Sequence, residues 1–389
     1  MKQIDKATTG RLSRNMSLVG HSDLAGQSDG GQVLVKDGIA YVGHMGHGRR
    51  GTSIVDVSDP SKPRVIAQME VPSGTHSHKV QLVGDLLLVN YERNRFEPDT
   101  ESWLGGIKIY DVQNPSKPNP IGWFGVPGKG VHRMTCQQFP YVYVSASAEG
   151  WSEQIFMIVD ITDPVSPVEV GRWGVDGMHE ADAEKRRWPL DRKFTHHHPI
   201  IRENRAYCSW WDGGLVVLDI TDPTQPTELH HFELDAQLSG HTHTALPVPG
   251  RDLLILVDEA IRSDNPITCT RHIRVLDIAD ERALREVAKF PVPSGDFREH
   301  GGTFGPHNLH EMQPGSFVSS DLIYATYNNA GVRLFNISNP LDPIEVAFFV
   351  PLDPRDHPIQ INDIYVNADG LIYATDKVAG GLYIIEQSG

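Results

Sequence analysis

The sequence predicts an all-β protein, a seven-bladed β-propeller that forms one domain over residues 1–389. Two observations predict this fold: a phrase of ten residues that returns along the chain, and short alternating strands separated by turn residues. A third observation is a likeness between the two ends of the chain. It predicts a ring that is closed by the N-terminal strand.

The repeated phrase lies 49 to 59 residues apart from copy to copy, which leaves room for four short strands in each unit. Its copies are IVDVSDPSKP from Ile54, IYDVQNPSKP from Ile109, IVDITDPVSP from Ile158, VLDITDPTQP from Val217, VLDIADERAL from Val275, LFNISNPLDP from Leu334 and a truncated LYIIEQSG from Leu382. We expect blades at approximately 21–72, 73–127, 128–176, 194–235, 239–293, 300–351 and 357–389 plus 12–20.

The two ends of the chain complement each other. The last unit stops after its third strand, while RNMSLVGH near the N-terminus is similar to the fourth strands of other units, such as PVEVGRWGV. We therefore expect Met16–Gly20 to pair onto the last blade. That pairing would close the ring and cover the exposed edge of its last sheet.

Composition excludes several classes of function. The formal net charge is −15 and there is no basic run, so we expect no nucleic-acid partner. The N-terminus lacks the apolar stretch of a secretory signal and no segment is apolar enough to span a bilayer, so we expect a cytoplasmic protein with no membrane partner. A homo-oligomer is compatible with the sequence.

Three scattered cysteines, Cys136, Cys208 and Cys269, are expected to be buried residues of the core.

Many of the 19 histidines fall at the same phase of the repeat, at the start of the first strand of a unit. Residues two apart in a strand face the same side, so histidines at this phase are expected to point into the central channel. Several imidazoles at one axis suit iron or copper, with manganese or zinc also open. The expected metal ligands are His78, His198, His243 and His310, and His132 joins them after a slip of one residue.

The second histidine of each pair lies one pleat step away from the expected ion, too far to share it. We expect these side chains, His76, His196, His241 and His307, to bind substrate or transfer protons. The second strands end beside the same mouth, where Glu259 is a candidate general base. The expected substrate pocket consists of Trp210, Trp211, Asp212 and Glu92. The charged insertion 177–193 is either a lid over the mouth of the channel or a solvent-exposed loop.

The repeated phrase resembles the LVIVD-type repeat, and its copies IVDVSDPSKP and VLDITDPTQP are similar to repeats of the selenium-binding protein or methanethiol oxidase family. That resemblance implies a metal in the channel and oxidative chemistry. Carotenoid cleavage oxygenases, which are propellers with axial histidines, offer an analogy at the level of the fold.

Three functions follow from these patterns. The first is a metal-dependent oxidase or oxygenase that uses Fe(II) or copper and O2 on a small organic substrate, either sulfur-containing or aromatic. The second is a metal-dependent hydrolase or lyase, in which the ion polarises a carbonyl or activates water. The third is a non-catalytic propeller scaffold that binds a protein partner.

Overall fold

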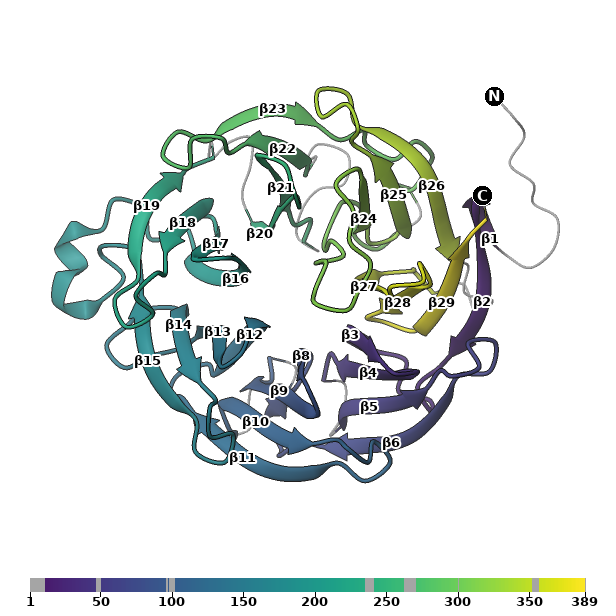
Figure 1. Cartoon of the computed structure of the whole chain (residues 1–389), viewed down its shortest axis with the longest axis horizontal. Helices are drawn as coiled ribbons and strands as arrows, with labels where there is room; N and C mark the ends of the chain where they lie inside the picture. The colour runs from purple at the N-terminus through teal and green to yellow at the C-terminus, as the bar shows by residue number, and fades with distance from the viewer. Residues whose placement is uncertain are drawn as a thin grey trace.

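The computed structural model describes residues 11–46, 50–95, 97, 102–234, 241–261, 271–299, 301–351 and 357–388. Its antiparallel sheets stand around a common centre, which is the arrangement of a β-propeller (Figure 1). In most sheets the first strand lies near the centre and the last strand at the rim. Among the described residues the one helix is η1 (Glu180–Lys185), a 3-10 helix within the insertion 177–193.

The first three sheets in chain order cover residues 30 to 173. The first contains β3 (Gly30–Lys36), β4 (Ile39–His44), β5 (Arg50–Asp56) and β6 (Arg64–Glu70). The second contains β7 (Thr75–His76), β8 (Val80–Val83), β9 (Leu86–Arg93), β10 (Gly106–Asp111) and β11 (Asn119–Gly125). The third contains β12 (Val131–Gln138), β13 (Tyr141–Ala146), β14 (Ile155–Asp160) and β15 (Val168–Trp173).

An eight-stranded sheet follows, in which two four-stranded groups are joined by a single pair, Trp211 and Thr242. The first group is β16 (Phe194–Arg202), β17 (Arg205–Trp211), β18 (Leu215–Asp219) and β19 (Thr227–Phe232). The second group is β20 (Thr242–Pro247), β21 (Leu253–Asp258), β22 (Ile273–Asp277) and β23 (Arg285–Lys289). The last two sheets are built from β24 (Leu322–Thr326), β25 (Val332–Asn336) and β26 (Ile344–Pro351), and from β27 (Ile361–Val366), β28 (Ile372–Asp376) and β29 (Gly381–Gln387).

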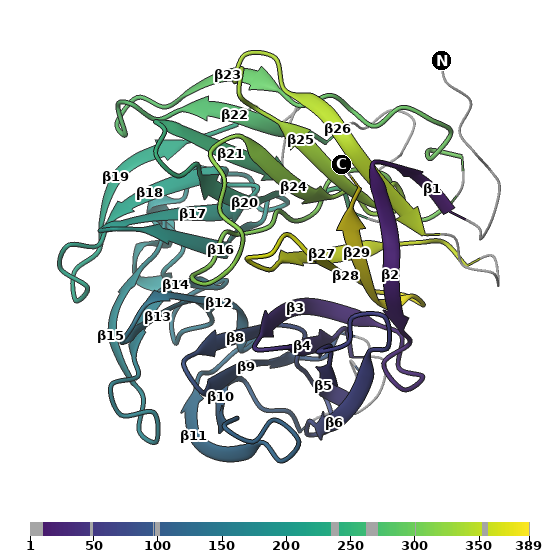
Figure 2. The ribbon, with the colours of Figure 1, turned by 45° about the vertical axis from the view of Figure 1, so that its right-hand side comes forward.

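The N-terminal segment adds an outer strand to each of these last two sheets (Figure 2). Strand β2 (Met16–Ser22) pairs with β29, with Met16 opposite Gln387, so the expected pairing of Met16–Gly20 is present. The expectation that residues 12–20 form one strand of the last blade is wrong for its first part. Strand β1 (Arg11–Arg14) pairs with β26 instead, because Asn15 adopts a left-handed φ of 55° and ends the strand between the two sheets.

The repeated phrase is explained by its turn. In the first copy, the carboxylate of Asp56 accepts a hydrogen bond from the backbone N–H of Ser58, and the carboxylate of Asp59 accepts one from Ser61, each at 3.1 Å. Side chains that bond to the backbone two residues ahead form turns that end a strand. The same two bonds recur in five further copies, at Asp111 and Asn114, Asp160 and Asp163, Asp219 and Asp222, Asp277 and Asp280, and Asn336 and Asn339.

Neighbouring sheets contact each other through a glycine of the fourth strand. A Cβ atom at Gly122 would overlap the carbonyl oxygen of Pro164 in the following sheet, and one at Gly171 would overlap that of Pro223. Gly20 in β2 has the same relationship to Pro60. The sheet that holds the C-terminal strand therefore contacts the first sheet in the way that the second contacts the third.

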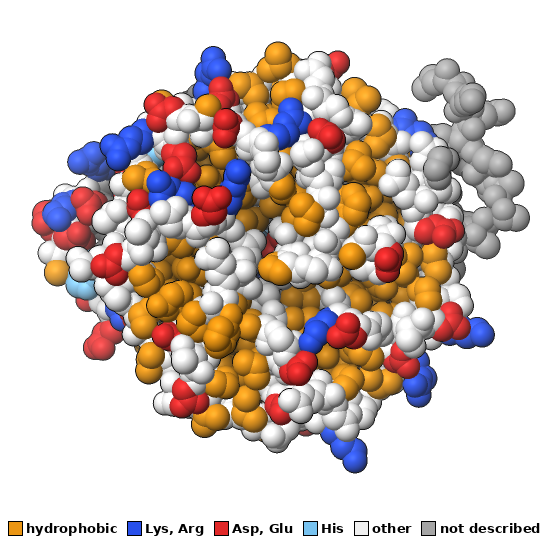
Figure 3. All heavy atoms as spheres, viewed as in Figure 1, with side chains coloured by type: hydrophobic (Ala, Val, Ile, Leu, Met, Phe, Trp, Pro, Cys, Tyr) orange, Lys and Arg blue, Asp and Glu red, His pale blue; other side chains and the backbone are white. Residues whose placement is uncertain are grey.

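Apolar side chains fill the space between the sheets in several buried clusters. Cys136 and Cys208 are buried and unpaired, as expected, and Cys269 lies outside the described residues. On the face drawn in Figure 3, many charged side chains lie near the rim, and histidine is visible only at the left edge. Within the described part of the chain, no helix combines the length and the apolar character needed to cross a membrane.

Candidate metal centre

Five consecutive sheets each place one histidine at an irregularity of the pairing near the centre: in β12, β16 and β20, between β7 and β8, and in the segment before β24. In β12 the pairing with β13 slips between Val131 and Arg133, and His132 is the extra residue. In β20 it slips between Thr242 and Thr244, and His243 is the extra residue. A bulge of this kind turns a side chain out of the normal alternation. The five histidines at this position are His78, His132, His197, His243 and His307.

These imidazoles form an arc of side-by-side rings. The centroids of successive rings along the arc lie 5.0, 4.6, 4.1 and 4.5 Å apart. His76 extends the arc at one end, with its ring 4.6 Å from that of His78. Six imidazoles from five successive repeats therefore meet at one place in the molecule.

The FTHHHPI segment contributes a different histidine from the two that we expected. The slip in β16 lies between Phe194 and His198, so the middle residue, His197, enters the arc. His196 is fully buried instead, with its ring 5.6 Å from Phe156 and 5.1 Å from Trp210. Strict alternation across three consecutive histidines fails here because the strand is irregular where they occur. The signal for His197 in the sequence is that it aligns with His132 in the repeat, one residue away from the position of His198.

Trp210 does not line the expected substrate pocket. Its side chain is fully buried in the core, and its ring lies 5.5 Å from that of Trp173. Trp211 is the tryptophan beside the arc, with its ring 5.4 Å from that of His197. The two neighbours separate in this way because successive residues of a strand face opposite sides.

His198 and His310 also lie outside the arc. His198 follows the bulge, and its Nε2 atom lies 3.5 Å from Glu311 in the next layer of the channel. His310 is held by the backbone: it accepts a hydrogen bond from the N–H of Val366 at 3.2 Å and donates one to the carbonyl of Phe317 at 2.8 Å. With both ring nitrogens engaged, His310 has no free donor atom for a metal ion.

Two glutamates contact the arc, and each defines a set of candidate ligands. Glu92 lies 3.4 Å from His76 Nε2 and 4.0 Å from His78 Nδ1, and we call these three residues the Glu92 set. Glu259 lies 4.0 Å from His243 Nε2, and with His197 these residues form the Glu259 set. In each set the three donor atoms lie within 4.8 Å of one another.

Two further imidazoles extend these sets. His307 lies with its Nε2 atom 3.2 Å from Glu259, so it adds a fourth donor beside the Glu259 set. His132 lies between the two sets, because its Nδ1 atom is 3.0 Å from Glu92 and its Nε2 atom is 3.0 Å from His197 Nε2.

Hydrogen bonds fix which nitrogen of these rings carries the lone pair. His197 Nδ1 donates to the carbonyl of His243 at 3.2 Å, and His307 Nδ1 donates to the carbonyl of Asn362 at 2.5 Å. His132 Nδ1 donates to the carboxylate of Glu92. In the rings of His132 and His197 Nε2 is then the acceptor, a pattern that orients metal-binding histidines in proteins, whereas Nε2 of His307 faces the carboxylate of Glu259 at 3.2 Å. The Nε2 lone pairs of His132 and His197 therefore point toward the same region, as do two donor atoms that converge on one ion.

Burial keeps five of the six imidazoles of the arc neutral near pH 7. It lowers the pKa of His76 and His307 to about 4. The same cause lowers the pKa well below its usual value in His78, His197 and His243. A neutral imidazole is the form that binds a metal ion, so no proton has to be removed first.

The two carboxyl groups stay ionised. Burial alone would raise the pKa of Glu92, but the neighbouring His132 and His76 lower it to about 2. Burial opposes ionisation of Glu259 as well, and His307 together with Lys377 lowers its pKa to about 2. Neutral imidazoles with ionised carboxylates are the donors that iron, copper and zinc accept in proteins, so the residues fit a transition metal.

Three residues lie beside the arc near Glu259. His241 precedes β20, adopts a left-handed φ of 62°, and its ring lies 4.7 Å from that of Trp211. Its Nε2 atom lies 3.8 Å from the carboxylate of Asp212, and the two side chains are 15% and 17% exposed. His241 therefore does not share the arc with His243, and it forms a partly exposed pair with an acid instead.

A charged layer lies next to the arc, one residue further along the first strands. Lys79 and Arg133 follow His78 and His132, and both side chains are buried. Arg133 is paired with Glu311, and burial lowers the pKa of Lys79 to about 7. Asp363 belongs to the same layer, where burial raises its pKa to about 6.

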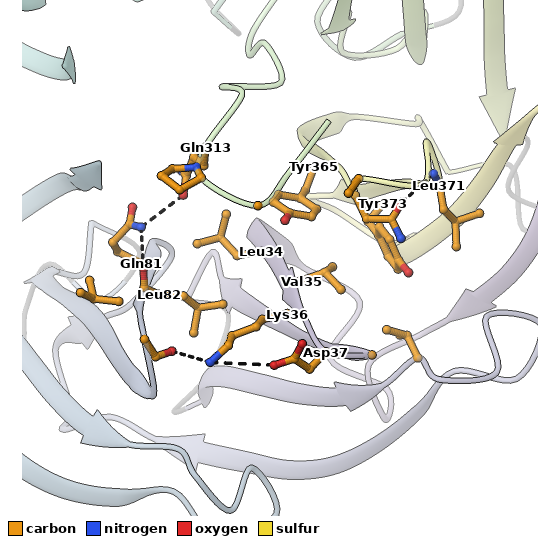
Figure 4. A pocket seen from close by; sticks show the side chains of 18 of the residues that line it. Leu34, Val35, Lys36, Asp37, Gln81, Leu82, Gln313, Tyr365, Leu371 and Tyr373 are labelled. Carbon is orange, nitrogen blue, oxygen red and sulfur yellow. Dashed lines mark hydrogen bonds and ion pairs between the residues drawn. The ribbon is translucent and has the colours of Figure 1, made fainter. Parts of the chain in front are cut away.

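The far ends of the first strands line a pocket of about 770 Å³. Gln81 donates a hydrogen bond to Gln313 at 3.2 Å at its inner side, and Leu34, Leu82 and Tyr365 line it (Figure 4). Because the histidines lie at the beginnings of the first strands and this pocket at their ends, the charged layer separates the two.

Comparison with known proteins supports the fold. The LVIVD repeat model matches residues 29–70, 141–174 and 200–233. Among curated proteins, none matches the chain. A structure of a hypothetical selenium-binding protein from Sulfolobus tokodaii is similar over 92% of this chain and 92% of its own, with a TM-score of 0.60 and 15% identity. The β-propeller domain of Cps50 (Swd1) from Myceliophteria thermophila is similar over 97% and 99%, with a TM-score of 0.58 and 14% identity. At these identities the likeness shows the β-propeller fold alone.

Proposed function

We propose that this chain is a seven-bladed β-propeller metalloenzyme that binds a transition metal ion at the Glu259 set and oxidises a small organic substrate. The blade count rests on dividing the eight-stranded sheet at its single joining pair, Trp211 and Thr242, which gives seven units for the seven copies of the repeat. The pairing of β2 with β29, together with the contact of Gly20 with Pro60, supports closure of the ring by the N-terminal strand.

The proposed metal site rests on one observation. The Nε2 atoms of His132 and His197 face each other at 3.0 Å, and the Nδ1–H group of each ring donates a hydrogen bond to another acceptor. Two ligands of a tetrahedral ion with bonds of about 2.0–2.1 Å lie roughly 3.3 Å apart, so this separation is close to that of two ligands of one ion. Glu259 supplies a charged oxygen on the Nε2 side of His243 and His307. The expected ligands are therefore His132, His197, His243, His307 and Glu259.

When bound, iron or copper supplies redox chemistry with O2 that the side chains lack. The chain's own contribution lies around that position. Asp212 places a negative charge 3.8 Å from Nε2 of His241, an imidazole suited to proton transfer. Trp211 lies against both His197 and His241 and offers an apolar surface to a substrate at the same place.

The choice of an oxidative reaction and of a sulfur-containing or aromatic substrate rests on the resemblance of the repeats to the selenium-binding protein or methanethiol oxidase family. The fold likeness to the hypothetical selenium-binding protein from S. tokodaii agrees with that resemblance. The propeller fold alone does not specify a reaction, since similar propellers serve unrelated functions.

The test is metal analysis of protein purified without an affinity tag, followed by oxygen-uptake measurements with small thiols and phenols. We expect bound iron or copper and uptake that depends on substrate. Bound zinc or manganese without oxygen uptake would overturn the oxidative reaction and indicate a hydrolase or lyase. Protein that binds no transition metal after loading would overturn the metalloenzyme and favour a scaffold.

A further inference from the structure

We infer that the arc holds a second, separate metal ion in the Glu92 set, so that the protein has a two-ion centre with His132 between the ions. This inference rests on the proposed function, which needs only the ion at the Glu259 set. It adds His76, His78 and Glu92 as ligands of their own ion.

The Glu92 set has the donor geometry of a metal site by itself. His76 Nε2 and Glu92 Oε2 lie 3.4 Å apart, which is the separation of roughly 3.3–3.5 Å expected for two ligands of a tetrahedral ion. His78 Nδ1 lies 4.0 Å from the same oxygen, and it accepts a long hydrogen bond of 3.4 Å from the amide of Asn90, which it would exchange for the ion. All three side chains are largely buried, at 7%, 5% and 13% exposure, so they are held in place without a bound ion.

The two sets are distinct because they come from different repeats. The Glu92 set belongs wholly to the second sheet, whereas the Glu259 set comes from β16, β20 and the residue after β21. Between them stands the ring of His132 from the third sheet, whose Nδ1 atom faces Glu92 and whose Nε2 atom faces His197. A single ion at either side could not contact both carboxylates without displacing that ring.

The surrounding charge permits two cations. Each set contains one ionised glutamate, which offsets part of the charge of its own ion. The nearby layer contains two cationic side chains, Lys79 and Arg133, and two acidic ones, Glu311 and Asp363. The formal charges of this layer cancel, and the remaining nearby cations are Arg95 beside the Glu92 set and Lys377 beside the Glu259 set, one for each glutamate. An arc with six imidazoles and two carboxylates also offers more donors than one ion uses.

The test is metal stoichiometry with Zn2+ as the probe. Untagged full-length protein is stripped with a chelator, loaded with excess Zn2+, passed through a desalting column and measured by mass spectrometry of metals. We expect two zinc ions per chain in the wild type and one in Glu92→Gln. Asp212→Asn is the matched control, because it removes an acid near the arc that belongs to neither set, and it should keep two ions.

Each outcome decides between the two proposals. One ion per chain in the wild type, or an unchanged ion count in Glu92→Gln, would overturn the second ion and leave the proposed function standing. Loss of both ions in Glu92→Gln would show one shared site and would also overturn it. No ion in the wild type would overturn the proposed function as well. Should Glu92→Gln fail to fold, titration of the wild type with Co2+ replaces it: two breakpoints in the visible absorption support the inference and one contradicts it.

Discussion

The Nε2 atoms of His132 and His197 lie 3.0 Å apart, although the two residues belong to different sheets and are 65 positions apart in the chain. Each residue occupies the bulge of its own first strand, and the hydrogen on each ring is engaged by another acceptor. The repeat thus brings equivalent positions of successive units to one axis. The bulge then turns their side chains toward each other.

The adjacent histidines His196 and His197 should respond differently to replacement. His197→Ala removes a candidate ligand, and we expect it to lower the metal content by half or more with little change in stability. His196→Ala removes a fully buried ring between Phe156 and Trp210, and it should lower the free energy of unfolding by about 3 kcal/mol while metal content is retained. Metal analysis and urea denaturation of both variants check this. The assignment is wrong if the metal follows His196.

His307 and His310 form a second matched pair. His307→Ala should reduce metal content, because its Nε2 atom faces Glu259 at 3.2 Å. His310→Ala should keep the metal and lower the free energy of unfolding by about 3 kcal/mol, since the N–H of Val366 and the carbonyl of Phe317 lose their buried partner. The same two measurements apply. Equal loss of metal in both variants would contradict the geometry described above.

How much the sequence could predict differs between the fold and the site. The repeat phrase predicts the strands and turns because its aspartates and prolines act locally, as the bonds of Asp56 and Asp59 show. The likeness of RNMSLVGH to the fourth strands also predicts that Met16 pairs with the last strand, which the register confirms. The left-handed turn at Asn15, which sends Arg11–Arg14 to a neighbouring sheet, leaves no comparable mark in the sequence.

For the site, the phase of the repeat identifies the region of each unit where the histidines lie, but it does not identify which of the clustered histidines points into the arc. Alternation is a rule for regular strands, and the first strands are irregular where the histidines occur. It therefore places His78, His132 and His243 in the arc and misplaces His198 and His310. It also places His76 and His307 one step away, whereas their rings lie in the arc itself. Contacts between sheets, such as that of Glu92 with His132, depend on the ring of blades and cannot be derived from one unit.

Acid stability should depend on the turn aspartates. Hydrogen bonds from the hydroxyl and the backbone N–H of Ser61 lower the pKa of Asp59 below its usual value of 3.8. A lowered carboxyl pKa stabilises the fold above the unfolded value, and this stabilisation is lost as the pH falls through the folded pKa. Asparagine does not titrate and makes the same bonds, as Asn114 does with Ser116.

Asp59→Asn should consequently melt at the wild-type temperature at pH 7, and at a higher temperature than the wild type at about pH 3. Asp59→Ala is the control, since it lacks the acceptor and should melt below the wild type at pH 7. Thermal melts followed by circular dichroism at the two pH values measure all three proteins. If Asp59→Asn loses stability on acidification as steeply as the wild type, the turn aspartate does not contribute to acid sensitivity.

Deletion of the N-terminal strands should destabilise two sheets at once. Removing residues 1–22 takes β1 from β26 and β2 from β29, and with them the buried side chain of Met16. The loss of a buried methionine alone costs about 2–5 kcal/mol, and the exposed edges of β26 and β29 would favour aggregation. We therefore expect this deletion to lower the free energy of unfolding by about 4 kcal/mol or more and to increase light scattering on heating. Deletion of residues 1–14 keeps β2 and is the comparison; it should melt between the 1–22 deletion and the wild type. An unchanged melting temperature after removal of residues 1–22 would show that the pairing of Met16 with Gln387 adds nothing to stability and that the propeller does not depend on its N-terminal strand.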